Sequence, residues 1–180
     1  IYSTTLIFFI FFSVGFFFED LIVSLFKNLF NIDLRTIIAR MIQQLIEQTR
    51  DLSYFGLMKF IFLNNVQSSL YGVIFGIFFS IFPLIAIIFN GYLLGFVGLM
   101  SVKAEGLLIL WKILPHGIFE LPAIFISLGL GIRLGVHFLT KEKIPFKTLL
   151  INSLKVFILI IVPLLVIAAF IEASLIFLGS

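Results

Sequence analysis

The longest uncharged part of the chain is residues 60–102, which lie between Lys59 and Lys103. A helix needs about 20 apolar residues to cross the hydrocarbon core of a bilayer, so this stretch is long enough for two crossings. Of the 180 residues, 62% are hydrophobic and 12% are charged, whereas an ordinary soluble domain has about 25% charged residues. The sequence therefore excludes a soluble enzyme and a disordered chain. It predicts an all-α membrane protein with a single transmembrane domain over residues 1–180.

The length of the chain suggests about five spanning helices. The turn between the second and third is placed at Asn90-Gly91, because this dipeptide is a strong turn signal. The first apolar stretch could instead be a signal peptide, but it shows no basic start and only a poor cleavage site. We therefore expect it to be retained as a span. The spans are predicted near residues 2–18, 67–89, 92–113, 118–138 and 154–177.

Residues 19–59 differ from the rest of the chain because charges alternate with apolar residues at helical spacing. Asp33 is a plausible N-cap within this segment. The pattern predicts one or two amphipathic helices that lie in the membrane interface or pack on the spans. Such a helix either rests on the bilayer or binds a partner. Apolar residues recur at i, i+3 and i+4 in two runs: Leu21, Ile22, Leu25, Phe26, Leu29 and Phe30, then Leu34, Ile37, Ile38, Met41, Ile42, Leu45 and Ile46.

The distribution of lysine predicts the orientation in the membrane. Short loops rich in Lys and Arg stay on the inner side, and the stretch 140–155 is basic, whereas acidic and basic residues balance in 19–65. The N-terminus is therefore expected inside, and the amphipathic segment and the C-terminus outside. The overall excess, 12 basic against 9 acidic residues, is interpreted as topology and lipid contact. No basic run indicates nucleic acid as a partner, and the absence of cysteine excludes disulfides and thiolate chemistry.

Glycines four residues apart occur in three predicted spans. Small residues at this spacing let helix backbones approach closely in lipid. We interpret them as helix-packing positions in a tight bundle that extends across a homo-oligomer interface. They are Gly72 and Gly76, Gly91 and Gly95, and Gly131 and Gly135.

The most unusual segment is residues 114–123, because it combines two prolines with His116 and Glu120. Proline removes a backbone donor and clashes with the preceding turn, so a broken helix is predicted near 115–122. His116 and Glu120 would share one helix face, on which Ser127 and Gly131 follow. A carboxyl at membrane depth costs about 2.5–3.5 kcal/mol and is therefore expected to be partnered, protonated or functional.

Arg133 would lie about 20 Å along a straight helix from Glu120, at 1.5 Å per residue. Lys103, Lys112 or His116 is therefore the more plausible partner of this carboxyl.

Three interpretations of His116 and Glu120 compete. They satisfy the backbone at a broken helix or pin neighbouring helices, or they line an aqueous path in a channel or transporter. A catalytic or metal site is the third. One His and one Glu supply at most two ligands, and neither an HExxH motif nor a nucleophile–base pair is present. No catalytic residue, metal or cofactor is therefore predicted.

Five motifs in this order resemble the stage II sporulation protein M family of integral membrane proteins. The stretch Pro-His-Gly-x-x-Glu-Leu-Pro is the most specific of them, and the resemblance covers roughly residues 55–140. The motifs are Phe60-x-x-x-Asn64-Asn65, Gly72-x-x-x-Gly76, Asn90-Gly91-x-x-x-Gly95, Leu114-Pro115-His116-Gly117-x-x-Glu120-Leu121-Pro122-Ala123 and Gly131-x-Arg133-Leu134-Gly135.

The resemblance implies a multi-pass protein of the cytoplasmic membrane of a bacterium or archaeon. In spore-forming bacteria the family's namesake is a scaffold that holds peptidoglycan-degrading partners together and has no established catalysis. We therefore predict a non-enzymatic scaffold or recruitment protein whose partners are the lipid bilayer and other membrane or envelope proteins. A channel or secondary transporter with a His116/Glu120 site is the alternative. The resemblance carries over the motif positions Asn64, Asn65, Asn90, Gly91, Pro115, His116, Gly117, Glu120 and Arg133.

Overall fold

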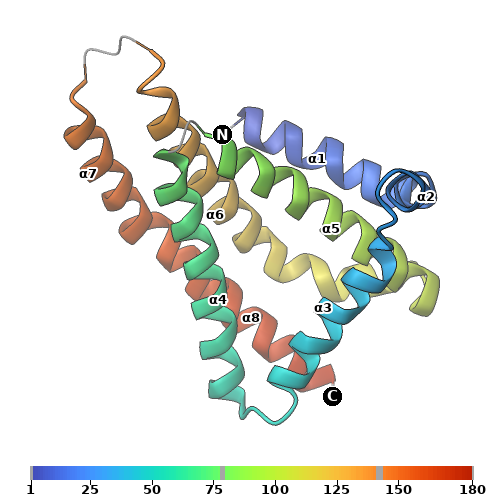
Figure 1. Ribbon diagram of the computed structural model, residues 1–180. Helices are drawn as coiled ribbons and strands as arrows, with labels where there is room; N and C mark the ends of the chain where they lie inside the picture. Colours follow the sequence, from blue (N-terminus) through green and yellow to red (C-terminus); the bar gives the residue numbers. More distant parts are fainter. Residues whose placement is uncertain (1, 78–79, 141–143, 180) are drawn as a thin grey trace.

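The computed structural model describes residues 2–77, 80–140 and 144–179, without the side chains of residues 111–116. Within these residues the chain is helical and contains no strand (Figure 1). The elements are α1 (Tyr2–Phe17), α2 (Glu19–Phe30), α3 (Leu34–Thr49), α4 (Tyr54–Ile74), the 3₁₀ turn η1 (Phe75–Ile77), α5 (Ile81–Glu105), the 3₁₀ turn η2 (Leu107–Ile109), α6 (Leu110–Val136), α7 (Phe146–Val156), the π-helical turn η3 (Phe157–Ile161) and α8 (Val162–Gly179).

Four helical segments in the described part are long and apolar enough to cross a membrane, and α1 with α2 forms a fifth if this bent pair counts as one span. The prediction of an all-α protein with about five spans is thereby confirmed. The successive spans alternate in direction (Figure 1). The four segments are Tyr54–Ile77, Ile81–Glu105, Gly117–Val136 and Phe146–Leu178.

The predicted boundary between the second and third spans is wrong. Asn90 and Gly91 lie inside α5, and the chain instead turns at Ser80, whose φ of 63° is left-handed. The Ser80 hydroxyl donates to the carbonyl of Ile132 at 2.8 Å and so fixes the turn against α6. Asn90 fits a helix interior because its Nδ2 donates to the Ala86 carbonyl one turn back, at 2.8 Å. The spans predicted at 67–89 and 92–113 are therefore replaced by α4 with η1 and by α5.

The broken helix predicted near 115–122 is also absent, because α6 continues from Leu110 to Val136. Pro115 and Pro122 lie within it. Each proline removes one backbone hydrogen bond, but a spanning helix tolerates this loss where neighbouring helices support it. Proline has a visible effect in the last span, where the π-helical turn η3 immediately precedes Pro163.

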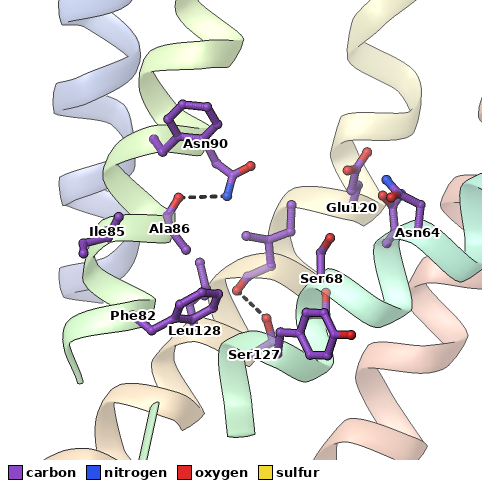
Figure 2. A pocket seen from close by; sticks show the side chains of 14 residues that line it. Asn64, Ser68, Phe82, Ile85, Ala86, Asn90, Glu120, Ser127 and Leu128 are labelled. Carbon is purple, nitrogen blue, oxygen red and sulfur yellow. Dashed lines mark hydrogen bonds between the residues drawn. The ribbon is translucent and has the colours of Figure 1, made fainter. Parts of the chain in front are cut away.

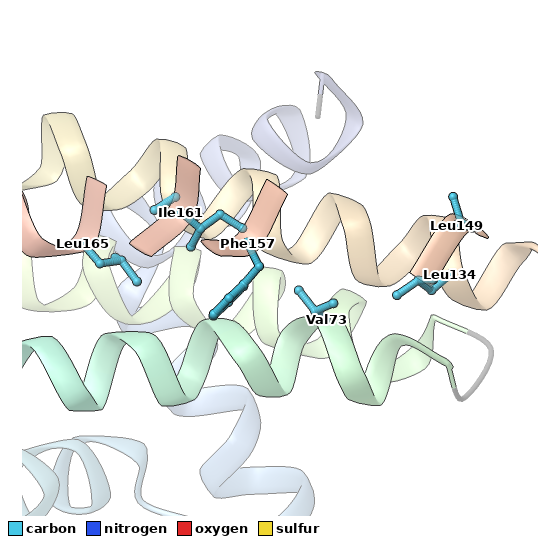
Figure 3. Packing of buried hydrophobic residues seen from close by; sticks show 7 residues of the cluster. Val73, Leu134, Leu149, Phe157, Ile161 and Leu165 are labelled. Carbon is cyan, nitrogen blue, oxygen red and sulfur yellow. The ribbon is translucent and has the colours of Figure 1, made fainter. Parts of the chain in front are cut away.

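Helix α6 is central to the bundle and packs on two sides. One cluster joins it to α4, α7, η3 and α8 through Val73, Leu134, Leu149, Phe157, Ile161 and Leu165, which are at most 5% exposed (Figure 3). A second cluster joins α6 to α1 and α5, and its centre is Phe8, Ile87, Phe125 and Leu128. The spans therefore form two groups that share α6.

Two close helix contacts place backbone against backbone. A Cβ built on Gly95 of α5 would lie 2.1 Å from the Phe12 carbonyl oxygen of α1, and one on Gly91 would lie 2.6 Å from that of Phe8. Gly91 lies against Phe8 and Gly95 against Phe12, so the residue numbers increase in the same direction along both helices. Helices α1 and α5 therefore run parallel (Figure 1). Side chains larger than glycine would force these helices apart.

The second close contact joins α4 and η1 to α6. A Cβ on Gly131 would meet the Gly72 carbonyl oxygen at 2.1 Å, and one on Gly135 would meet that of Gly76 at 2.2 Å. The two glycine pairs therefore lie against each other in parallel register.

Helices α2 and α3 form an arm that leaves α1 at a bend of 86°. Asn31 ends α2 in the left-handed conformation, and the Asp33 side chain caps α3 by accepting from the Thr36 backbone N–H at 3.3 Å. This hydrogen bond holds the pKa of Asp33 below its usual value. The predicted amphipathic segment thus contains two helices, but it ends before residue 59 because α4 begins at Tyr54.

The arm is attached to the bundle at Glu19, whose side chain is 1% exposed. Its Oε1 accepts from Arg35 Nε of α3 at 2.6 Å, and its Oε2 lies 3.7 Å from Lys103 Nζ of α5. Arg35 also binds Asp20. We refer to Glu19, Arg35 and Lys103 as the elbow cluster. Lys103 therefore pairs with Glu19 and is excluded from the three candidate partners of Glu120. The side chains of the other two, Lys112 and His116, lie outside the described residues.

Candidate functional site

A polar groove of about 470 Å³ lies between α4, α5 and α6 (Figure 2). Its floor is α6 and its walls are α4 and α5, and all of its lining residues belong to helical segments able to span a membrane. The groove exists because the two walls are held by different neighbours. Glycine contacts fix α4 on α6 and α5 on α1, so the walls do not close on each other.

The floor carries Glu120 and Ser127, which are two helical turns apart on one face of α6. The Ser127 hydroxyl donates to the Ile124 carbonyl at 2.9 Å. The half-buried Glu120 carboxyl has no hydrogen bond or ion pair with any described side chain. Within a segment able to span a membrane, Glu120 is therefore an acidic group without a cation among the described side chains.

The wall formed by α4 presents amide and hydroxyl groups at helical spacing. Asn64, Asn65, Ser68 and Ser69 line the groove, and Asn64 lies beside Glu120 (Figure 2). Ser69 is 3% exposed, yet its hydroxyl has no hydrogen-bond partner among the described residues. Buried hydroxyls in proteins are nearly always hydrogen-bonded. The unpaired Ser69 hydroxyl therefore indicates that a bound molecule supplies the missing hydrogen bond.

The wall formed by α5 is mainly apolar, with Asn90 as its polar residue. Because Asn90 Nδ2 already donates within its helix, its carbonyl oxygen remains to accept a hydrogen bond from an occupant. Phe82, Ile85 and Phe89 form the rim and are 41%, 60% and 46% exposed. The groove is therefore open along one side and has an oxygen-rich floor.

The sequence-predicted residues separate into two sets. Asn64, Asn65, Asn90 and Glu120 all line the groove. Gly91 instead faces α1, and Arg133 is exposed near the far end of α6. Gly117 is half-buried on α6. The side chains of Pro115 and His116 lie outside the described residues, although their backbone belongs to α6.

Sequence reasoning missed Ser68, Ser69 and Glu172. The two serines extend the face begun by Asn64 and Asn65, so the helical period of polar residues in α4 was the available signal. Glu172 is the sole charged residue of α8, and charge within an apolar span is itself a signal. It is close enough to Glu120 for electrostatic interaction, but it does not line the groove.

No group of three or more His, Cys, Asp or Glu residues in the described part of the chain could hold a metal ion. The groove offers one carboxylate together with amide and hydroxyl groups. These groups can bind a cation and accept or donate hydrogen bonds. The arrangement is typical of recognition, and the described residues of the groove contain no nucleophile paired with a base.

Comparison with known proteins gives the chain a family. An uncharacterized protein of Methanocaldococcus jannaschii is 36% identical over 118 residues, which are 62% of this chain and 66% of that protein. No solved structure matches the chain. The sequence profile of the stage II sporulation protein M family matches residues 4–175, nearly the whole length. The chain therefore belongs to the stage II sporulation protein M family of membrane proteins.

Proposed function

We propose that this protein is a membrane scaffold that recruits other membrane proteins through the polar groove, without catalysis of its own. The observation that carries the proposal is a polar groove open between two spans, with an unpaired carboxyl on its floor among the described side chains. Polar groups facing lipid are costly, and polar side chains in membranes serve as contacts between helices. A helix from another protein would cover and satisfy these groups.

The shape of the groove favours a protein occupant over a small solute. Pockets for small molecules enclose their ligand and bury about 70–90% of its surface. This groove is not enclosed on one side, because the rim residues Phe82, Ile85 and Phe89 remain 41–60% exposed. A helix can lie along an open groove and still bury its contact face.

The family supports a scaffold in the cytoplasmic membrane of a bacterium or archaeon, where it would serve complexes that remodel the cell envelope. We place the N-terminus and the basic stretch 140–155 inside and the C-terminus outside. The lipid bilayer and further copies of the chain complete the proposed set of partners. No cofactor enters the proposal.

A crosslinking experiment in native membranes tests the recruitment. A photoreactive residue at Ser68, which is exposed and lines the groove, is expected to give a discrete protein adduct. The matched control is Leu159, which is 72% exposed on η3 and outside the groove. It is expected to label lipid. Filling the groove with Ile85→Trp should abolish the Ser68 adduct, and identical adducts from both positions would contradict the proposal.

A channel or secondary transporter is the second candidate, and the polar groups along the groove favour it. In that case Glu120, with His116 one turn away on α6, would bind an ion or small solute on its path. Reconstituted liposomes with a pH- or ion-sensitive dye decide between the two. The scaffold predicts no gradient-driven flux above that of empty liposomes. A flux that Glu120→Gln abolishes would overturn the scaffold.

A further inference from the structure

The groove has an acidic side chain, Glu120, on its floor and is open along one side. These two features limit which molecules can bind in it. We infer that it binds a spanning helix of another protein that carries a lysine or arginine near mid-membrane, paired with Glu120. This inference rests on the proposed scaffold function and adds the chemistry of the partner.

Charge complementarity is the first argument. The groove contains Glu120, three asparagines and three serines, and none of the described side chains that line it is basic. The nearest described basic residue on α6, Arg133, is more than three turns away. A helix with a basic residue would bring the missing counter-charge, because a carboxylate inside a membrane is stable when it is paired.

The unsatisfied groups of the walls provide the second argument. Lysine and arginine carry several N–H donors and no acceptor. Asn64 on α4 and Asn90 on α5 line the two walls, and each has a side-chain carbonyl that can accept a hydrogen bond. A cationic head paired with Glu120 would meet amide carbonyls on the walls, whereas an acidic or purely apolar helix would leave Glu120 unpaired.

A second copy of the chain fits this requirement less well. Among the described basic side chains of the spans, Lys59, Lys103 and Arg133 lie within two turns of a helix end. Lys155 lies nine residues inside the span Phe146–Leu178, so a second copy that binds through Lys155 is the competing occupant that the test must separate. Lys103 is also held by Glu19. Glu120 is the eleventh of the 27 residues of α6, so a partner whose charge lies near the middle of its own helix would match this position.

The test uses the full chain in lipid vesicles and synthetic spanning peptides as probes. Each peptide is a Leu/Ala helix of about 20 residues with Lys, Leu or Glu at its centre. Because the chain has no cysteine, a single donor dye can be attached through Ile151→Cys on α7, away from the groove. Binding is measured by energy transfer to a dye on the peptide.

We expect the Lys peptide to bind at least tenfold more tightly than the Leu peptide, and the Glu peptide to bind most weakly. Glu120→Gln should reduce Lys-peptide binding to the level of the Leu peptide while leaving Leu-peptide binding unchanged, which shows that the groove is still folded. Glu105→Gln is the matched control, because it removes an exposed carboxyl at the end of α5 that lies outside the groove. It should preserve the preference for Lys.

Several outcomes would overturn the inference. Equal binding of the Lys and Glu peptides, or Lys binding that survives Glu120→Gln, would show that charge does not select the partner. Displacement of the Lys peptide by unlabelled Glu120→Gln chain, which has lost its own preference for the Lys peptide, would assign the groove to a second copy. Its displacement by n-butylammonium, but not by butyrate, would assign the groove to a small cation.

If the Ser68 adduct persists in any of these cases, the scaffold proposal stands without this inference. If the adduct is also absent, both fail.

Discussion

Replacing Gly131 with alanine is expected to destabilise the bundle strongly. The new Cβ would lie 2.1 Å from the Gly72 carbonyl oxygen and 3.0 Å from Pro83 Cγ. Neither neighbour is the end of a flexible side chain, so α4 and α6 must separate. Overpacking of this kind costs about 1–3 kcal/mol, and its severity here places the loss at the upper end. We expect the thermal midpoint in detergent or nanodiscs to fall by about 10 °C.

Gly117→Ala on the same helix is the control for this experiment. The nearest atom that its Cβ would meet is Leu121 Cδ1 at 3.9 Å, an ordinary contact. Alanine is also the better helix former by about 1 kcal/mol, so the midpoint should stay constant or rise slightly. Equal losses in both variants would show that close packing does not explain the effect. The separation of α4 and α6 should also alter the Ser68 crosslink, because both helices line the groove.

The second large effect is expected from Arg35→Met, which removes the shortest ion pair of the elbow cluster. Glu19 would then remain 1% exposed with only Lys103, at 3.7 Å, as a cation nearby. Leaving a buried carboxylate without its hydrogen-bond partner costs about 2–3 kcal/mol. The chain can avoid this cost by releasing the arm, so α2 and α3 should exchange their amide hydrogens faster. Hydrogen exchange resolved by mass spectrometry measures this directly.

Arg40→Met on α3 is the matched control, because Arg40 is exposed and has no ion pair among the described residues. It should leave exchange in the arm unchanged. Glu19→Gln, which removes the buried charge, should release the arm less than Arg35→Met does. Faster exchange across all spans in Arg35→Met would indicate general unfolding and would contradict a local role for the elbow cluster.

Much of the fold could be predicted from the sequence because membrane insertion depends on local composition. The uncharged run at 60–102 requires spanning helices whatever their neighbours, and the helical period of residues 19–49 marks the arm. The helix boundaries were harder, because they depend on contacts between distant residues. Asn90-Gly91 resembles a turn locally, but Gly91 packs on Phe8 of α1. The true turn requires the bond from Ser80 to Ile132, which no local pattern reveals.

The same limit applies to the candidate site. Glu120 and the asparagines attracted attention because polar groups are rare within spans, and the structure gathers four of these residues in one groove. Their partners could not be inferred, since charge patterns do not show which helices are adjacent. Lys103 seemed available to Glu120, but it pairs with Glu19 across the elbow. Prolines also gave a misleading signal, because α6 continues through Pro115 and Pro122.

The parallel pairing of α1 with α5 sets an order for biosynthesis. Synthesis proceeds at about 5–20 residues per second, so α1 enters the bilayer several seconds before its main partner exists. During that interval its contact surface lacks α5; this surface includes Gly15, where a Cβ would lie 2.3 Å from the Tyr92 carbonyl oxygen. The elbow cluster is also incomplete, because Lys103 lies at the end of α5. A nascent chain that stops before α5 therefore has neither the partner of α1 nor the second cation for Glu19, and it would present both defects together to membrane quality control.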